Sequence, residues 1–415
     1  MAEPLIVIGE PPKPLGPAMG AERVEAIDVL RGMALFGILA ANLRGFAGPA
    51  AVYMDTKLFW TQPADRIVQA LIEIFIQGKF ITIFSTLFGL GFAVMFERAS
   101  DRGADFRAIY VRRLSILLVF GLAHALLLWF GDILTTYAAA GFFLFLFANR
   151  PPRTLLRWGW ALYCLPLVIF LGFVIAGWFG AAPKMPEPTA AELASTVEVY
   201  STGTWAEIFH ERAKELGPIA AMTALFASRL IGLFVLGAWL WRIGLFRDTK
   251  RFVPVLRRWV WPLFWLGVAG NAACVALMQL TALDVKNPNP AGLAIWTVSS
   301  AAVAALSASY GAMVLLAFQD PDWQVRLRPF GAVGRMALTN YILQSVICTT
   351  LFYSYGFGWY GKGGPALFLT PTFVIYGLQI PFSVWWLARY RFGPLEWLWR
   401  TLTYGSPPPM RRAVA

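Results

Sequence analysis

The sequence predicts an all-α, polytopic membrane protein with about ten transmembrane helices and both termini in the cytoplasm. Hydrophobic residues make up 58% of the 415 residues and charged residues only 14%, whereas a soluble domain has roughly 25% charged residues. Apolar runs of about 20 residues, long enough to cross a hydrocarbon core of ~30 Å, recur from Ile27 to Tyr390. Basic residues gather in alternate loops, as in multi-pass helical proteins.

Each span is predicted to be an α-helix, because backbone amides inside lipid must find partners within the same segment. The alternating segments that a β-barrel requires do not occur. A further stretch, Ala64–Ile76, has apolar residues at helical spacing and is expected to form a re-entrant or interfacial helix before the second span. In order, the predicted spans are 26–46, 77–97, 109–130, 133–149, 156–179, 222–242, 258–280, 292–318, 331–354 and 366–389.

The distribution of basic residues predicts the topology. Of the 35 Lys and Arg residues, 22 lie in four alternate loops and the C-terminal tail, and nine lie in the intervening loops. Cytoplasmic loops are enriched in Lys and Arg, so both termini are expected in the cytoplasm. The predicted parts are a cytoplasmic tail (1–25), a five-helix membrane half (26–180), an outer, periplasmic loop (181–221), a second five-helix half (222–390) and a cytoplasmic tail (391–415).

The predicted outer loop is acidic and begins with a Pro-rich stretch. Two short surface helices are expected in it, at Ala190–Tyr200 and Trp205–Leu216. Its histidine, His210, is expected to be exposed, and exposure makes it a weak candidate for a site.

The composition also limits the partners. The formal net charge is +12, but the basic residues sit at helix ends. No nucleic acid is therefore expected, and membrane lipids with anionic headgroups are the expected partners. Cys164, Cys274 and Cys348 lie in apolar segments without metal or disulfide spacing, so no metal site is predicted. The segment Met1–Glu22 lacks the features of a cleaved signal, so the first span is expected to act as an uncleaved insertion signal.

Ionisable groups inside spans are costly, so each is a candidate for pairing or for function. Asp28 and Arg31 open the first span with i, i+3 spacing, which puts both on one helix face. Two interpretations stay open. One is a local ion pair at the start of the helix, and the other is a cationic site for a phosphate or anionic headgroup in which Asp28 orients Arg31.

His124 lies in the third span, about a turn and a half from its outer end. Asp132 follows in a short outer hairpin, and Tyr137 begins the fourth span. A buried histidine can act as a general base near neutral pH, and Asp132 would orient it. The alternatives are a histidine hydrogen-bonded between helices and an Asp132 that caps the fourth span. Close approach of the two residues would favour the catalytic interpretation.

Two further cations lie within the predicted spans. Lys79 follows Gly78 near the start of the second span, where it either snorkels to the outer boundary or pairs with Glu73 across a bend at Gly78. Arg229 lies in the sixth span and needs a partner or a water-filled cavity.

The ninth span carries a polar stripe that includes Arg335, Asn340 and Gln344 at helical spacing. Asn340 and Gln344, four residues apart, share one helix face. Such a stripe either joins helices or forms the polar wall of a cavity. Glycines such as Gly89 and Gly334 allow close approach between helices.

Four stretches together resemble the bacterial YeiB-type membrane proteins. They are the opening Ile27–Asn42, the Gly78–Gly91 stretch with its Gly-Lys-Phe and Leu-Phe-Gly-Leu-Gly motifs, Gly131–Leu134, and a closing block from Gly334 to Arg400. The resemblance covers nearly the whole chain. In that family the C-terminal half is classed as domain of unknown function 418.

The YeiB-type family is similar in its first spans to a wider superfamily of membrane acyltransferases. The superfamily includes bacterial enzymes that O-acylate surface polysaccharides and the lysosomal heparan-glucosaminide acetyltransferase. These enzymes take an acyl group from cytoplasmic acyl-CoA and deliver it to an acceptor across the membrane. The resemblance implies that Asp28 and Arg31 lie in the corresponding cytoplasmic motif.

The chain departs from that superfamily at its catalytic histidine. The polysaccharide-acylating enzymes have a histidine where this chain has Asn42, and the lysosomal enzyme relies on one in the following outer loop. The segment Leu43–Lys79 contains no histidine. His124 is therefore the only intramembrane histidine left for a catalytic role.

Three functions stay open. In the first, a transmembrane acyltransferase, a CoA-type donor binds near Arg31, His124 acts as general base on the acceptor, and Lys79, Asn42 or Asn340 stabilises an oxyanion. The second is a transporter or flippase of a lipid-like or amphipathic metabolite. The third is a non-catalytic component that binds lipid, quinone or a protein partner, and the Gly-rich spans would suit a homodimer. The remaining candidates for substrate binding are Tyr137, Arg229, Arg335 and Gln344.

Overall fold

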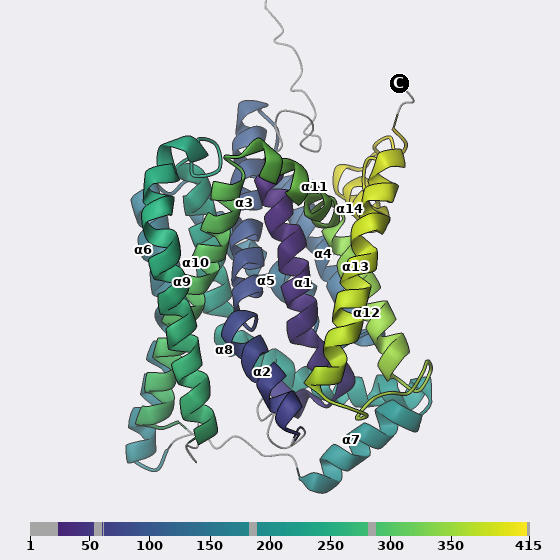
Figure 1. Ribbon diagram of the computed structural model, residues 1–415. Helices are drawn as coiled ribbons and strands as arrows, with labels where there is room; N and C mark the ends of the chain where they lie inside the picture. Colours follow the sequence, from purple (N-terminus) through teal and green to yellow (C-terminus); the bar gives the residue numbers. More distant parts are fainter. Residues whose placement is uncertain (1–23, 54–59, 61, 182–188, 281–287, 413–415) are drawn as a thin grey trace, which may run out of the picture.

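The computed structural model describes residues 24–53, 60, 62–181, 189–280 and 288–412, which are almost entirely helical (Figure 1). The predicted properties of Met1–Glu22 lie outside the described residues. In chain order the elements are α1 Glu25–Ala47, η2 Ala50–Tyr53, α2 Pro63–Phe75, α3 Lys79–Asp101, α4 Phe106–Leu127, α5 Leu134–Phe142, η4 Phe143–Phe147, α6 Pro152–Trp178, α7 Ala190–Thr202, α8 Trp205–Arg242, α9 Thr249–Leu280, α10 Pro290–Ala317, α11 Pro321–Arg335, α12 Ala337–Phe352, α13 Pro365–Arg389 and α14 Pro394–Tyr404.

The predicted class, a polytopic helical membrane protein, is confirmed. In the described part of the chain, eight helical segments are long and apolar enough to cross a membrane. Two further apolar helical segments are shorter, α5 with η4 and α12. Each of the ten predicted spans falls on one of these segments. The start of α1, together with α11 and α14, lies at one end of the bundle, here called the inner end, and α7 lies at the opposite, outer end (Figure 1).

Helix α1 runs through the centre of the bundle and packs against α3, α11, α12 and α13 (Figure 1). Helix α8 packs against α3 and α6, and α9 pairs with α10. Large apolar side chains of the peripheral helices, such as Val168 and Trp178 of α6 or Val374 and Leu378 of α13, are exposed on the surface. Such a surface suits a lipid environment, because lipid solvates apolar groups as a protein core does.

Two helix crossings depend on glycine. A Cβ on Gly89 of α3 would overlap the carbonyl of Phe234, and one on Gly237 of α8 would overlap the carbonyl of Thr86. In the same way, a Cβ on Gly334 of α11 would overlap the backbone of α1. The predicted role of Gly89 and Gly334 in close helix approach is therefore confirmed. Both are used inside one chain and are not exposed for contact with a second copy.

The structure divides the predicted ninth span into two helices. Helix α11 ends at Arg335 and α12 begins at Ala337, six residues after the predicted start of the span. The cause is a cap supplied from elsewhere in the chain. The Glu396 carboxylate of α14 accepts from the backbone N–H groups of Leu338 (2.6 Å) and Thr339 (3.0 Å), so α12 starts afresh there. Arg335 consequently lies in the last turn of α11 at the inner end.

The predicted surface helices are present, with one difference. The first is α7, and the second is the start of α8, which continues without a break into the sixth span despite Pro218. The predicted helix before the second span is α2, and it meets α3 at Gly78, whose φ of 82° lies in the left-handed region that glycine adopts readily. The predicted bend at Gly78 is therefore present.

Candidate functional site

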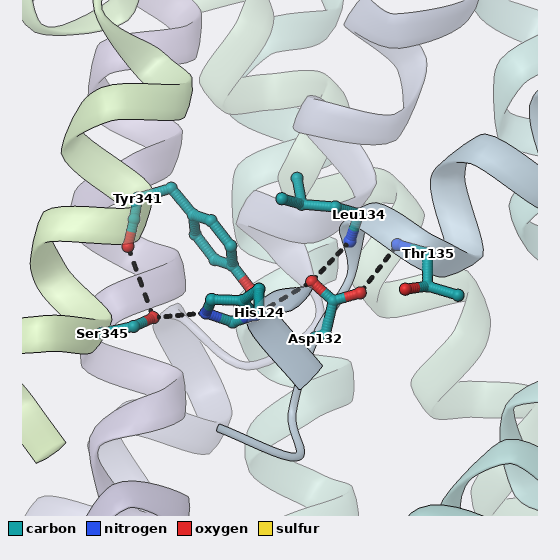
Figure 2. A network of polar contacts seen from close by, with 6 residues as sticks. All are labelled: His124, Asp132, Leu134, Thr135, Tyr341 and Ser345. Carbon is teal, nitrogen blue, oxygen red and sulfur yellow. Dashed lines mark hydrogen bonds and ion pairs between the residues drawn. The ribbon is translucent and has the colours of Figure 1, made fainter. Parts of the chain in front are cut away.

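His124 and Asp132 face each other across the tight turn between α4 and α5 (Figure 2). His124 lies in the last turn of α4, and its Nδ1 atom is 3.0 Å from Oδ1 of Asp132. The two helices approach closely because Gly121, about one turn before His124, has no side chain. A Cβ at Gly121 would overlap the backbone nitrogen of Thr135 in α5. The close approach that the catalytic interpretation requires is therefore present.

Asp132 also caps α5. Its Oδ2 accepts from the N–H of Thr135 (2.7 Å) and its Oδ1 from the N–H of Leu134 (3.1 Å). These bonds are those of a helix N-cap, so the two interpretations of Asp132 hold together. One buried carboxylate fixes the start of α5 and also holds the imidazole of His124.

The other nitrogen of the imidazole contacts a residue 221 positions away in the sequence. Nε2 of His124 is 2.8 Å from Oγ of Ser345 in α12 (Figure 2). Ser345 is 1% exposed and His124 is 2% exposed. The sequence pattern predicts a role for the neighbouring Gln344 and none for Ser345. A serine inside a helix ordinarily bonds back to its own turn, and here the distance to the carbonyl of Tyr341 is long, at 3.4 Å.

These contacts define what each polar atom does. With Asp132 ionised and His124 neutral, the carboxylate can only accept, so the ring proton is placed on Nδ1, which donates it. Nε2 then has no proton and accepts from the hydroxyl of Ser345. In this arrangement a histidine removes the proton of a nucleophilic hydroxyl while a carboxylate fixes the histidine tautomer. The three residues are therefore arranged like the nucleophile, base and orienting carboxylate of a serine–histidine–aspartate triad.

Aromatic side chains enclose the turn that carries the site. The ring of Tyr341 lies 5.0 Å from the imidazole of His124. Trp129 stacks on Phe46 of α1 at 3.9 Å, and its indole N–H donates to the carbonyl of Gly45. Asn42, the predicted oxyanion residue of α1, is one turn before Phe46 and shares its helix face. Its role in a site stays a prediction.

Lys79 lies in a separate polar cluster. Its ammonium donates to the backbone carbonyl of Glu73 and to Oδ1 of Asn271 (2.8 Å), and the side chain is buried. The carboxylate of Glu73 accepts from Gln69 (2.8 Å) and lies 3.9 Å from Arg44. Lys79 therefore pairs across the bend rather than snorkelling, although its partner in Glu73 is the carbonyl and not the carboxylate.

Arg229 and Tyr137 have partners of their own. The guanidinium of Arg229 donates to the hydroxyls of Ser300 (3.1 Å) and Tyr163 (2.6 Å), which joins α8 to α10 and α6. The hydroxyl of Tyr137 is 2.7 Å from that of Ser85 in α3. None of these bonds involves His124, so neither Arg229 nor Tyr137 directly contacts the serine–histidine pair through them.

The polar stripe of α12 joins this helix to α13. Gln344 donates to Oε1 of Gln379 (2.8 Å), Gln379 donates to the carbonyl of Asn340 (2.9 Å), and Asn340 donates to Ser383 (3.0 Å). Gln379 also lines an apolar groove of about 460 Å³ between α12 and α13. The helix-joining interpretation of Asn340 and Gln344 therefore matches their contacts, and they point away from Ser345 around the helix.

The inner-end candidates lie far from the histidine. Asp28 and Arg31 form the expected ion pair at 3.6 Å, and the Arg31 side chain is 31% exposed. Arg335 donates to the carbonyl of Arg391 at 3.4 Å. Arg31 is 14 residues before Gly45, where Trp129 is anchored, a separation of about 21 Å along α1. The structure therefore contains two distinct regions, one at the inner end and one around His124.

The fold and this site define the chain as a polytopic helical membrane protein with a buried serine–histidine–aspartate constellation. The family described as a protein of unknown function (DUF418) matches residues 240–406. The chain is 35% identical over 418 residues to the uncharacterized protein YxaH of Bacillus subtilis (strain 168), which covers 96% of this chain and 98% of that protein. It is 31% identical over 406 residues to the uncharacterized protein YeiB of Escherichia coli (strain K12), which covers 94% and 98%. The chain belongs to the YeiB family, and the resemblance predicted from its motifs is confirmed.

Proposed function

We propose that this protein is an acyltransferase of the bacterial inner membrane that moves an acyl group from a CoA-type donor to an acceptor at or across the membrane. The observation that supports this most is the imidazole of His124, hydrogen-bonded to Asp132 on one side and to Ser345 on the other. The relatives YxaH and YeiB are bacterial proteins, which agrees with a bacterial membrane.

The reaction has two half-reactions. In the first, Oγ of Ser345 attacks the thioester carbonyl while Nε2 of His124 takes the hydroxyl proton, and Asp132 stabilises the imidazolium. The C–S bond then breaks, and the proton passes from Nε2 to the leaving thiolate. In the second, Nε2 takes a proton from the acceptor hydroxyl or amine, which attacks the acyl-serine. The serine oxygen leaves with that proton, and the starting state is restored.

The surroundings favour transfer over hydrolysis. Ser345, His124 and Asp132 are all buried among apolar and aromatic side chains, so bulk water has little access to an acyl-serine. A dry site also strengthens each electrostatic interaction with the developing charge. The amide of Asn42 is the candidate donor to that oxyanion because it lies on the face of α1 that also carries Phe46.

The depth of the site fits an acyl group that crosses the membrane. Arg31 at the inner end offers a cationic contact for the anionic part of a CoA-type donor. The thioester arm then has to extend about 21 Å along α1 to reach the turn at Trp129. The acceptor reaches the same serine from the outer end.

A fluorophosphonate probe tests the proposal, because it reacts with an activated serine. Purified protein is incubated with the probe, and the modified peptide is identified by mass spectrometry. We expect Ser345 to be labelled, Ser345→Ala to abolish labelling, and His124→Ala to slow it by about 10³-fold or more. Ser85→Ala is the matched control, because Ser85 is a fully buried helical serine bonded to Tyr137 and not to a histidine.

The donor is tested with acetyl-CoA and longer acyl-CoAs. We expect saturable thermal stabilisation of the protein that is lost in Arg31→Ala and retained in His124→Ala, together with acyl transfer to Ser345. If Ser345 is inert to the probe in folded protein, the constellation only joins helices and the acyltransferase proposal fails. If Ser345 is labelled but no acyl-CoA binds, the donor assignment fails alone.

A further inference from the structure

Part of the outer end of the bundle is covered by α7, the first turns of α8 to Leu216, and residues 353–364, which together we call the outer cap (Figure 1). Backbone bonds fasten its parts together. The N–H of Ser354 donates to the carbonyl of Tyr200 (2.8 Å), and the N–H of Gly361 donates to the carbonyl of Ala47 at the end of α1 (2.8 Å). The cap therefore lies directly over the helix ends that surround His124.

Beneath the outer cap, Arg212 of α8 is 0% exposed. Its Nη1 donates to the carbonyl of Leu126 (2.8 Å), two residues after His124 in α4. Its Nε and Nη2 atoms are buried and have no hydrogen-bond partner among the described residues. Burial of a guanidinium whose N–H donors have no acceptor costs free energy, unless a ligand group accepts from them.

The two unused nitrogens form a matched pair. Nε–H and Nη2–H lie parallel on one edge of the planar guanidinium, and this edge fits the two oxygens of a carboxylate or phosphate. Nη1, on the other side of the group, is the atom bound to Leu126. The protein therefore uses Nη1 to bind its own backbone and leaves the Nε–Nη2 edge without a partner among the described residues.

Two tyrosine hydroxyls add further donors. Tyr353 and Tyr360 are buried, and their hydroxyl oxygens have no partner in the described part of the chain. Their rings lie 5.8 Å apart, and the guanidinium carbon of Arg212 is 5.8 Å from the ring of Tyr353. Burial raises the pKa of both tyrosines well above the usual value, so both hydroxyls stay protonated and can donate.

The nearby carboxylate of Glu215 is already engaged. Its Oε2 accepts from the hydroxyl of Tyr200 at 2.7 Å. The ring of Tyr200 is stacked on that of Tyr360 at 4.7 Å and tilted against that of Tyr353 at 4.8 Å. In the described residues, no carboxylate forms an ion pair with Arg212. The cluster thus contains the guanidinium of Arg212 and three tyrosine rings. Among the described residues, Nε and Nη2 of Arg212 and the hydroxyls of Tyr353 and Tyr360 have no acceptor.

We propose that the Nε–Nη2 edge of Arg212, with the hydroxyls of Tyr353 and Tyr360, binds the carboxylate or phosphate group of a ligand that comes from the outer side. The ligand is the acceptor of the acyl group, an assignment that rests on the proposed function. The anion site and the serine–histidine pair are connected through α4 and α12. Leu126, which binds Arg212, follows His124 in α4, and Tyr353 comes directly after α12, eight residues after Ser345. That separation, about 12 Å along α12, is the distance that an acceptor would span with its anionic group at Arg212 and its hydroxyl or amine at Ser345.

Inorganic phosphate and acetate are the probes. Their binding to the full-length protein in detergent is measured by titration calorimetry and thermal shift in a buffer free of other oxyanions. We expect saturable binding that Arg212→Lys weakens by about tenfold or more, because lysine keeps the charge and loses the fork. Arg229→Lys is the matched control, because the donors of Arg229 are occupied by Ser300 and Tyr163, and it should leave the Kd unchanged.

If the Arg212 variants do not fold, Tyr353→Phe and Tyr360→Phe test the same anion site. Each variant removes a hydroxyl without a protein partner, so the fold should be as stable as before or more stable. Each should weaken anion binding by about fivefold. Phosphate and acetate that bind these variants and Arg212→Lys as tightly as the wild type, or that do not bind the wild type at all, would overturn the proposal.

A second arm identifies the source of the anionic group. Nanodiscs of phosphatidylcholine alone are compared with nanodiscs that also contain phosphatidylglycerol. A phosphate Kd that rises only with phosphatidylglycerol assigns the group to a lipid headgroup, and an unchanged Kd assigns it to a soluble compound. All binding is repeated in Ser345→Ala. If the wild-type protein binds phosphate at Arg212 but Ser345 is not labelled, the acyltransferase proposal is refuted and the anion site stands. If Ser345 of the wild type is labelled but no anion binds, the anion site is refuted and the acyltransferase proposal stands.

Discussion

Replacement of Asp132 by asparagine separates the two tasks of this carboxylate. The variant keeps the size of the side chain and removes its charge. If the amide oxygen takes the place of Oδ1, it still accepts from Leu134 and from Nδ1–H of His124, and the NH₂ faces the N–H of Thr135. If the amide is turned, its oxygen accepts from Thr135 and the NH₂ faces the N–H of Leu134 and Nδ1 of His124. Loss of one cap bond costs about 1 kcal/mol, and loss of the charge on the imidazole bond costs about 1 kcal/mol more. We therefore expect a stability loss of roughly 2 kcal/mol, which leaves the protein folded.

The effect on Ser345 should be far larger than the effect on stability. When the NH₂ of the variant amide faces Nδ1 of His124, it donates to that atom, the ring proton moves to Nε2, and the tautomer that accepts from Ser345 is lost. In serine hydrolases this change lowers the rate on the order of 10⁴-fold. The assay is the rate of fluorophosphonate labelling of Ser345, with thermal unfolding measured in the same samples. A folded Asp132→Asn protein that is labelled within about tenfold of the wild-type rate would refute the reasoning.

Three further outcomes follow from the packing. Gly237→Val places a side chain against the carbonyl of Thr86 and should lower stability by about 1–3 kcal/mol, measured by thermal unfolding in detergent; an unchanged midpoint would contradict the tight α3–α8 crossing. Arg229→Gln loses charged bonds to two hydroxyls and should cost roughly 2 kcal/mol in the same assay, with the exposed Arg153→Gln as control. Burial raises the pKa of Glu396 above its usual 4.5, so folding binds a proton and the unfolding midpoint should fall as pH rises above 4.5. Equal pH dependence in Glu396→Gln would show that this group is not responsible.

Most of the architecture could be predicted from local sequence patterns. The ten spans, the helix before the second span and the bend at Gly78 depend on residues that are neighbours in the chain, and all are present. The pairing of His124 with Asp132 was also accessible, because eight residues and one tight turn separate them. What these features share is a short sequence separation.

Long-range contacts set the parts that the sequence did not reveal. Ser345 reaches His124 across 221 positions, and nothing in its own turn distinguishes it from a structural serine. The break before α12 depends on Glu396, which lies 57 residues beyond Thr339. The unused edge of Arg212 appears only when α8, α4 and the segment after α12 are seen together. Each of these features needs the folded chain, because no periodicity encodes which distant side chain fills a given place.

The short length of α5 and η4, which form the fourth predicted span, has a consequence for the access of water to Ser345. Helix α5 and η4 together comprise 14 residues, a length of about 21–25 Å against a hydrocarbon core of ~30 Å. In a hydrocarbon core of that thickness, the turn at Trp129 and Asp132 is expected to lie below the outer boundary. The outer cap is held at this end of the bundle by the backbone bonds of Ser354 to Tyr200 and of Gly361 to Ala47. In the transferase that we propose, loosening these bonds should admit water to Ser345 and favour hydrolysis of the acyl-serine over transfer.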